Sequence, residues 1–310
     1  MRSLSVAIDA TDLFTVPREL ARGVAPWWQW AHFHPWLREM GVAVREGRVA
    51  RADVMAFWQS LGPRYLNGCL QGRSLLKPRG YSGDFDMMDA IYDNQISAET
   101  DLGGWDQLFQ SQAAPAAVRN RAEYFAAVAE ATQARMGRPL RIASVGCGPA
   151  RDIGPWLRER ACRGTEIRLI DLDAGALARA REVVRGTAAA VVTEHTSLAR
   201  LRLADQHDVI WAAGLFDYFS DRLFVSSMRK LLPLLPPSGA LVIGNFSTSN
   251  PTRDYMELCG DWFLHHRTAA DLTRLATDAL AASPPSRPVR VRVGQEPLGV
   301  NLFLELELGA

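Results

Sequence analysis

The sequence predicts an α/β fold in which a mostly parallel sheet follows a helical region. From residue 139 onward, short apolar runs alternate with helical stretches, which is typical of parallel strands covered by helices on both faces. The last two runs, 289–293 and 300–306, have no helix between them, and this predicts one antiparallel strand at the edge of the sheet. Before the sheet, residues 17–128 carry apolar and aromatic residues at helical spacing and contain no convincing strand.

The elements of the sheet region follow one another in a regular order. Strands are predicted from short apolar runs at 140–145, 167–170, 188–192, 209–213, 240–243, 289–293 and 300–306. Helices are predicted at 152–160, 175–184, 221–232 and 271–280. We therefore expect two parts along the chain, a helical N-terminal and lid region over residues 1–130 and a sheet domain over residues 131–310.

Composition and charge exclude several classes of protein. The 310 residues include 35 basic and 34 acidic side chains, so the basic excess of a nucleic-acid binder is missing. The four cysteines are widely spaced without a CxxC pair, and therefore neither a zinc or other metal site nor a disulfide framework is expected. No apolar run is long enough for a signal peptide or a membrane span. We expect a cytoplasmic protein, with its oligomeric state left open.

A pair of glycines marks the first candidate binding site. Gly146 and Gly148 follow the run 140–145 and precede a predicted helix, and glycine at such a turn lets the backbone approach a ligand closely. Asp171 ends the next predicted strand, where a carboxylate can accept hydrogen bonds from both hydroxyls of a ribose. Arg151 stands where a dinucleotide motif has its third glycine, which disfavours NAD and FAD. The pattern favours a nucleoside-type cofactor, and a purely structural strand–helix turn is the alternative.

These two segments resemble the first two motifs of the class I S-adenosylmethionine-dependent methyltransferases. Val145-Gly-Cys-Gly-Pro149 is similar to the first motif, and Leu169-Ile-Asp-Leu-Asp173 is similar to the second. The resemblance covers roughly residues 140–308 and implies a Rossmann-like sheet of seven strands, the last one antiparallel, with S-adenosylmethionine as the cofactor. The cofactor-binding residues that it implies here are Gly146, Cys147, Gly148, Asp171 and Leu172.

Three further segments, 78–92, 214–221 and 245–257, resemble a narrower bacterial family. That family includes enzymes that form methyl esters of 3-hydroxy fatty acids as quorum-sensing signals. The resemblance implies a methyltransferase of secondary metabolism that acts on a carboxylate of a small molecule. A related set of enzymes cyclises S-adenosylmethionine to azetidine-2-carboxylate and releases methylthioadenosine, and the motifs do not separate this chain from that set. A non-catalytic S-adenosylmethionine-binding sensor or partner subunit is the third possibility.

The polar loop 77–84 is predicted to act as a lid. It carries a phenol, a hydroxyl and a carboxylate among its glycines. If the loop folds over the carboxyl edge of the sheet, Asp84 can pair with the ammonium of the methionine moiety, and Arg79 can bind a carboxylate of the cofactor or the substrate. Tyr81 then closes over the cofactor. The alternative is that Asp84 only caps a helix that begins near Phe85.

Residues after the later strands complete the predicted cofactor site. Gly214, Asp217 and Tyr218 follow the fourth strand, and ligands of open α/β sheets lie at the strand ends. Asp217 and Tyr218 are therefore expected to contact either the methionine end of the cofactor or the acceptor. Ser197 and Leu198 follow the third strand and are expected around the adenine, through backbone groups.

The acceptor side is predicted from residues after the fifth strand. Asn245, Tyr255 and Glu257 are expected to line the acceptor pocket, and with Tyr81 they are the candidate catalytic residues. The sequence contains no unmistakable base. Since a carboxylate is already ionised at pH 7 and needs no base, this absence favours a carboxylate acceptor or the intramolecular cyclisation.

Overall fold

The computed structural model describes residues 13–21, 29–160 and 163–310, which form two compact units. The helical unit comprises the described residues up to Ser82, Gln95–Gln110 and Thr252–Trp262. The sheet unit comprises the described residues of Gly83–Asn94, Ser111–Pro251 and Phe263–Ala310. The chain thus passes between the units several times, and the division into domains after residue 130 stays a prediction.

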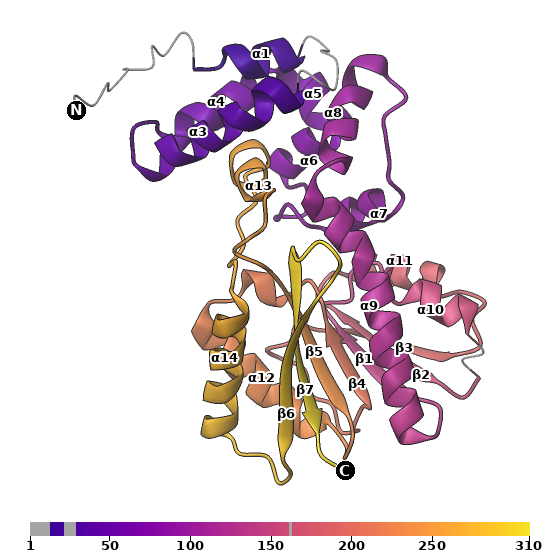
Figure 1. Ribbon diagram of the computed structural model, residues 1–310. Coiled ribbons are helices and arrows are strands. Elements are labelled where there is room, and N and C mark those ends of the chain that lie inside the picture. The colour runs from indigo at the N-terminus through magenta and orange to yellow at the C-terminus, as the bar shows by residue number, and fades with distance from the viewer. Residues whose placement is uncertain (1–12, 22–28, 161–162) are drawn as a thin grey trace. The chain divides into compact units, whose positions relative to one another are not determined.

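The sheet unit contains a seven-stranded sheet (Figure 1). Its strands are β1 (Arg141–Val145), β2 (Glu166–Asp171), β3 (Ala190–His195), β4 (Val209–Ala212), β5 (Ala240–Phe246), β6 (Val289–Gln295) and β7 (Asn301–Leu308). Their order is β3-β2-β1-β4-β5-β7-β6. The first five strands run parallel, and β7 is antiparallel to both β5 and β6. The predicted Rossmann-like sheet with an antiparallel last strand is confirmed.

The prediction that the antiparallel strand lies at the edge of the sheet is wrong. β7 is inserted between β5 and β6, so that β6 forms the edge. Both sequences alternate: β6 begins Val-Arg-Val-Arg-Val, and β7 ends Leu-Glu-Leu-Glu-Leu. The first four residues of β7 are nevertheless all buried, as expected of a strand paired on both sides. The arginines along one face of β6 suit a strand at the edge.

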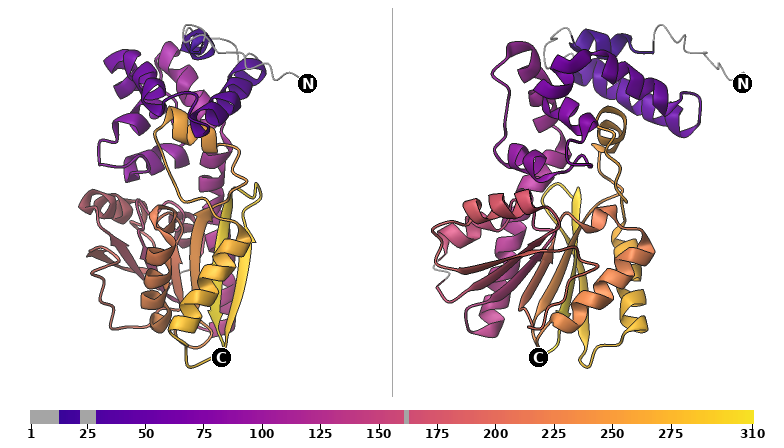
Figure 2. Two further views of the ribbon diagram at one scale, coloured as in Figure 1. Left: turned by 90° about the vertical axis from the view of Figure 1, so that its left-hand side faces the viewer. Right: turned by 180° about the vertical axis from the view of Figure 1, so that it is seen from behind.

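Alternate residues of the strands supply two cores on opposite faces of the sheet. The covering helices are α9 (Ala113–Met136), α10 (Gly154–Glu159), α11 (Ala174–Val183), α12 (Asp221–Leu231) and α14 (Ala269–Ala282). Ile142 and Trp211 pack in the core shared with α9, α10 and α11. Ala143 and Ile210 pack in the core shared with α12 and α14. Figure 1 and Figure 2 show these two helical layers on either side of the strands.

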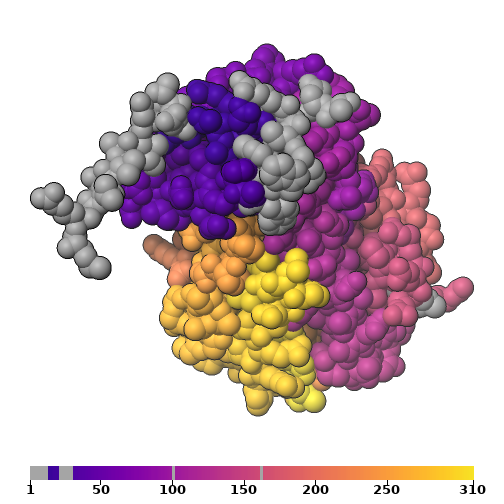
Figure 3. Space-filling view, turned by 45° about the horizontal axis from the view of Figure 1, so that its top comes forward, coloured from indigo at the N-terminus to yellow at the C-terminus, as the bar shows by residue number. Residues whose placement is uncertain are grey.

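Helix α9 continues past the predicted end of the helical region. It ends at Met136 because Gly137 takes a left-handed conformation with a φ angle of 64° and caps it. Tyr124 of α9 stacks on Phe303 of β7, with 3.8 Å between ring centroids. In Figure 3, the yellow residues of β6 and β7 adjoin the magenta residues of this helix. The helix is thereby anchored along the sheet from the carboxyl ends of the parallel strands to their amino ends.

The helical unit has no strand among its described residues, as the periodicity predicts. Its helices are α1 (Thr15–Ala21), η1 (Gln29–Phe33), α3 (His34–Arg45), α4 (Arg51–Ser60), α5 (Gly62–Gly68), α6 (Leu70–Leu76), α8 (Thr100–Gln110) and α13 (Arg253–Cys259). Trp58 forms the centre of its core and packs edge-on against Trp105 at 5.9 Å. The Trp58 indole N–H donates to the carbonyl oxygen of Leu258 at 2.8 Å, which fixes α13 in this unit. In the described ranges, no helix combines the length and the apolar character that crossing a bilayer requires.

Candidate functional site

The turn after β1 is built on left-handed backbone. Gly146 and Gly148 have φ angles of 65° and 50°, which glycine adopts without steric cost. The N–H groups of Gly146 and Cys147 both donate to the carbonyl oxygen of Ile170 on β2, at 2.8 and 3.1 Å. A Cβ added to Gly148 would have no described atom within 4 Å beyond its chain neighbours. The turn is therefore fixed from the β2 side and open at Gly148, where a ligand can approach the backbone.

The thiol of Cys147 is buried beneath this turn, and burial raises its pKa well above the usual value. The thiol consequently stays protonated at neutral pH and is a poor nucleophile. The contact of Cys147 with the cofactor stays a prediction.

Asp171 holds its carboxylate beside the open glycine. Oδ2 accepts a hydrogen bond from the Gly148 N–H at 2.8 Å, and Oδ1 accepts one from the Asp173 N–H at 2.9 Å. Each carboxylate oxygen has a second lone pair, so both remain able to accept from the hydroxyls of a ligand. Burial raises the pKa of Asp171, and the backbone donors oppose this rise. Leu172 follows directly and exposes 70% of its side chain, an apolar surface at the end of β2.

Asp84 begins helix α7 (Phe85–Tyr92) in the sheet unit. Its Oδ1 accepts a hydrogen bond from the Met87 N–H at 2.9 Å, so the expectation that Asp84 caps a helix is confirmed. The carboxylate is almost completely buried. A contact between Asp84 and the cofactor stays a prediction.

Helix α7 is joined to the glycine turn by ion pairs. Asp89 accepts from Arg151 Nη1 at 3.0 Å and from Arg179 Nε at 2.5 Å, and Arg151 also pairs with Asp93. Arg151 occupies the position of the third glycine in a dinucleotide motif. Its guanidinium is directed to α7, which accounts for an arginine at that position.

The turn after β3 contains Ser197 and Leu198. The Ser197 carbonyl oxygen accepts from the N–H groups of Arg200 and Leu201 at 3.0 and 2.9 Å. Lys230 Nζ donates to the carbonyl oxygen of Leu198 at 2.7 Å. Both carbonyl groups therefore already have donors, one set within the turn and the other from α12, and the contact of this turn with adenine stays a prediction.

Asp217 lies after β4, in the short 3-10 helix η2 (Phe216–Tyr218). Its carboxylate is almost fully buried and accepts from the Phe246 N–H at 2.6 Å, which connects η2 to the end of β5. Burial raises the pKa of Asp217 to about 6. Tyr218 differs in exposing 37% of its surface. The structure thus brings Asp217 to the same sheet edge as the glycine turn and Asp171, because β4 is the neighbour of β1.

Arg121 of α9 is a residue of this edge that the sequence analysis missed. It is 6% exposed, and its guanidinium lies 5.6 Å from the ring centroid of Phe246. In the amide orientation that satisfies both groups, Asn301 Oδ1 accepts from Arg121 Nε at 2.7 Å and from Nη2 at 3.0 Å. The signal was present in the sequence, because Ala117, Arg121 and Phe125 are four residues apart and share the buried face of one helix.

Asn245 is fully buried at the end of β5, and both the nitrogen and the oxygen of its side-chain amide are hydrogen-bonded. Nδ2 donates to the carbonyl oxygens of Phe246 and His265, each at 2.9 Å. Oδ1 accepts from Arg267 Nη1 at 2.7 Å, and Arg267 in turn pairs with Asp221 at 3.0 Å. These bonds give Asn245 a structural function, and its predicted contact with an acceptor stays a prediction.

The other residues predicted at the acceptor or the lid lie in the helical unit. Tyr255 is buried, and its hydroxyl donates to Gln71 Oε1 at 2.7 Å. Glu257 accepts from Arg253 Nε at 2.7 Å, one turn earlier in the same helix. Arg79 and Tyr81 are exposed in the loop that follows α6. The roles of these four residues in catalysis and cofactor binding stay predictions.

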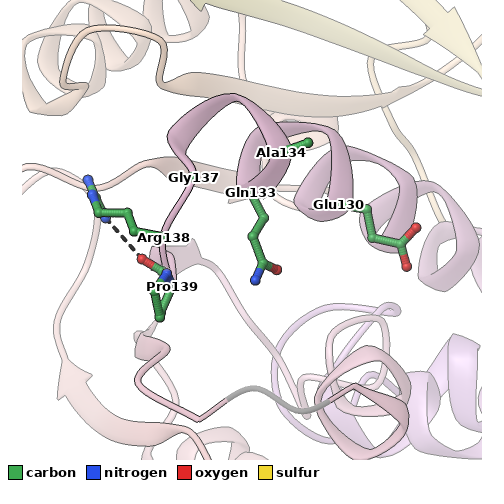
Figure 4. A pocket seen from close by; sticks show the side chains of 6 residues that line it. All are labelled: Glu130, Gln133, Ala134, Gly137, Arg138 and Pro139. Carbon is green, nitrogen blue, oxygen red and sulfur yellow. Dashed lines mark hydrogen bonds between the residues drawn. The ribbon is translucent and has the colours of Figure 1, made fainter.

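A shallow hollow of about 440 Å³ lies at the opposite end of the sheet unit, near the amino end of β1 (Figure 4). It is lined by Glu130, Gln133, Ala134, Gly137, Arg138 and Pro139. Arg138 forms a two-pronged ion pair with Asp208, with both hydrogen bonds 2.8 Å long. No residue of the predicted site lines this hollow. Within the described parts of the chain, no group of three or more His, Cys, Asp and Glu side chains is arranged to hold a metal ion.

Comparison with known proteins adds a family match and several similar folds. Residues 142–239 match the model of a family described as a methyltransferase domain. A possible exported protein from Bordetella parapertussis has a TM-score of 0.62 and 16% sequence identity, over 86% of this chain and 99% of that one. The plantazolicin methyltransferase BpumL, solved with a triazolic desmethylPZN analog and SAH, has a TM-score of 0.50 and 14% identity, over 78% of this chain and 97% of that one. No curated protein matches the chain.

Proposed function

Because the sheet unit contains a class I S-adenosylmethionine-dependent methyltransferase domain, we propose that the chain transfers a methyl group from S-adenosylmethionine to a carboxylate of a small molecule. The observation that carries the cofactor part of this proposal is the hydrogen bond from Gly148 to Asp171. It holds an acceptor for ribose hydroxyls beside a turn whose backbone is open to a ligand. The exposed side chain of Leu172 supplies apolar surface for a base next to that ribose.

The protein's part in such a transfer is alignment and exclusion of water. Bound S-adenosylmethionine supplies a methyl group on a sulfonium, which is already a good leaving group. Asp171 orients the nucleoside, and the edge formed by Gly214 and Asp217 receives the methionine end. The residues present at the ends of β1, β2 and β4 therefore fit the cofactor.

A carboxylate acceptor is supported by the charges at the ends of β4 and β5. A carboxylic acid has an unperturbed pKa near 4, so it is ionised at neutral pH and needs no general base. The buried guanidinium of Arg121 lies in the electrostatic field of Asp217, whose pKa it lowers against the effect of burial. Arg121 makes no direct hydrogen bond to that carboxylate, so its planar donor group can still pair with a carboxylate of a ligand.

A second function is favoured by the ionisation of Asp217. Cyclisation of S-adenosylmethionine needs a neutral α-amine, which forms a bond to its own γ-carbon while the bond from that carbon to sulfur breaks. With a pKa of about 6, Asp217 is ionised at pH 7 and able to take the proton that the ammonium must lose. The products are azetidine-2-carboxylate and methylthioadenosine.

The test is an analysis of products by mass spectrometry. The full-length protein is incubated with S-adenosylmethionine in the presence and absence of 3-hydroxydecanoate, and Asp171→Ala serves as the inactive control. We expect S-adenosylhomocysteine and the methyl ester only when the acid is present. Methylthioadenosine formed without the acid would establish cyclisation instead. Calorimetric binding of S-adenosylmethionine with neither product would contradict both enzymatic functions and favour a sensor.

A further inference from the structure

The guanidinium of Arg121 is buried at the site without an ionic partner. Among the described residues, no ion pair involves Arg121, and its described hydrogen bonds run from Nε and Nη2 to the neutral amide of Asn301. The buried carboxylates of Asp152 and Asp217 act on this charge electrostatically, without a direct hydrogen bond to it. The guanidinium therefore keeps hydrogen-bond donors that no carboxylate of the described chain takes up.

Nη1, the third nitrogen of the Arg121 guanidinium, lies near the carboxyl end of β4. A Cβ added to Gly214, directly after β4, would lie 3.0 Å from Nη1. No described hydrogen bond is made by Nη1, although Nε and Nη2 are both engaged. The absence of a side chain at residue 214 thus leaves room for the guanidinium and keeps one of its edges available to a ligand.

Two buried carboxylates lie in the electrostatic field of this guanidinium. Asp152 accepts from the Trp211 indole N–H at 2.6 Å, and Asp217 accepts from the Phe246 N–H at 2.6 Å. Burial raises the pKa of both acids, and the charge of Arg121 opposes that rise in each. Each acid thus has its own hydrogen-bond donor, and neither forms a direct pair with Arg121.

The strand order places Arg121 beyond the nucleoside side of the site. The glycine turn ends β1 and Asp171 ends β2, whereas Arg121 faces residues at the ends of β4 and β5 and at the start of β7. β4 separates β1 from β5 and β7. A ligand with its ribose at Asp171 therefore has to extend from the end of β2 across β1 to the end of β4 before any part of it reaches Nη1 of Arg121.

We propose that Arg121, held by Asn301, binds a carboxylate at the ends of β4 and β5 through Nη1. A guanidinium is suited to this because its planar N–H groups match the geometry of a carboxylate. The carboxylate belongs either to the methionine moiety of the cofactor or to the acceptor. This inference rests on the proposed function, and it replaces Arg79, an exposed loop residue, as the first candidate for carboxylate binding.

The test compares ligands that differ only in the carboxylate-bearing part. Wild-type protein and Arg121→Gln are titrated calorimetrically with S-adenosylhomocysteine and with methylthioadenosine, which has the same nucleoside and no amino-acid moiety. Complexes saturated with S-adenosylhomocysteine are then titrated with 3-hydroxydecanoate and with 1,3-decanediol. Arg121→Lys keeps the positive charge but lacks the planar pair of N–H donors with which a guanidinium binds both oxygens of a carboxylate. Arg135→Gln is the matched control, because Arg135 lies on the same helix and pairs with Glu307 at 3.4 Å, away from the site.

We expect Arg121→Gln to lose about 10- to 100-fold in affinity for one carboxylate ligand, as for a charged hydrogen bond, with Arg121→Lys losing less. A loss for S-adenosylhomocysteine alone assigns the carboxylate to the cofactor. A loss for 3-hydroxydecanoate alone assigns it to the acceptor. The proposal is wrong if neither affinity changes, or if methylthioadenosine and the diol lose as much as the acids. Since these are binding measurements, the inference can hold even if the product analysis excludes methyl transfer.

Discussion

Arg151 donates a hydrogen bond to Asp89 at 3.0 Å and so connects the turn after β1 with helix α7. The same carboxylate accepts from Arg179 of α11, so that one acidic side chain joins three segments of the sheet unit. Both partners of the first pair are mostly buried, with 19% and 17% of their side chains exposed. The glycine turn is therefore supported by charged contacts behind it, while its front at Gly148 remains open.

Replacing Asp89 should loosen this support. Asp89→Asn weakens two ion pairs at once, and we expect the free energy of unfolding to fall by about 1–2 kcal/mol. Glu182→Gln is the control, because it removes only the exposed pair between Arg179 and Glu182, at a cost of about 0.5 kcal/mol or less. Urea unfolding of the three proteins measures both effects. Equal stabilities for Asp89→Asn and Glu182→Gln would show that the buried pairs contribute nothing.

Removing the Asp171 carboxylate should weaken cofactor binding. Asp171→Ala loses the acceptor for two ribose hydroxyls, and we expect a loss of about 1.5–3 kcal/mol in binding of S-adenosylhomocysteine by calorimetry. Asp173→Ala is the control, since Asp173 caps α11 by accepting from the Gly175 N–H at 2.7 Å. It should lower stability by about 1 kcal/mol and leave the affinity near that of the wild type. If the affinity loss appears in Asp173→Ala instead, Asp173 is the ribose ligand.

The raised pKa of Asp217 predicts a dependence of stability on pH. Its value of about 6 in the folded protein lies above the ordinary 3.8, so the folded state binds this proton more tightly than the unfolded chain. The resulting stabilisation is complete below about pH 4 and is lost as the pH rises through about 6. Asp217→Asn keeps a side-chain oxygen that can accept from the Phe246 N–H, but the amide does not ionise. The stability of the wild type relative to this variant should fall by about 2–3 kcal/mol between pH 4 and pH 7. A constant difference in urea unfolding across that range would contradict the shifted pKa.

Asn245 allows structural and catalytic functions to be separated. Asn245→Ala leaves Arg267 without one buried acceptor and two carbonyl groups without their donor, so we expect the free energy of unfolding to fall by about 2–3 kcal/mol. If the residue is only structural, kcat of the folded variant stays close to the wild-type value. A drop of tenfold or more in kcat, with unchanged affinity for S-adenosylhomocysteine, would instead support the predicted place at the acceptor.

Hydrogen exchange tests the lid that the sequence predicts. If Tyr81 and its neighbours close over the cofactor, saturating S-adenosylhomocysteine should slow amide exchange across residues 80–85 at least severalfold. The amides of residues 289–295 in the edge strand β6 provide the internal control and should not respond. Exchange in the loop that is identical with and without the ligand would leave Asp84 as a helix cap alone.

The sequence by itself determined the strands, their order along the chain and the sheet edge at which the glycine turn and Asp171 meet. Periodicity is a local property, so apolar runs such as 140–145 and 209–213 identify strands without knowledge of their neighbours. The glycine turn and Asp171 follow from the same logic, because parallel strands bring their carboxyl ends to one edge. Only the strand order of the folded sheet shows that β6 and not β7 forms the edge, because both segments alternate apolar and charged residues.

The tertiary structure alone decided which charges meet at that edge. Arg121 precedes Asn301 by 180 residues, and only the packing of α9 on the sheet brings the two together. Likewise, Asn245 looks like a free polar residue in the sequence until Arg267 and two carbonyl groups surround it. Contacts between distant residues depend on how helices pack on a sheet, and local periodicity contains no term for that packing. The fold could therefore be deduced from hydrophobic patterns in the sequence, whereas the hydrogen-bond partner of each buried polar group is known only from the tertiary structure.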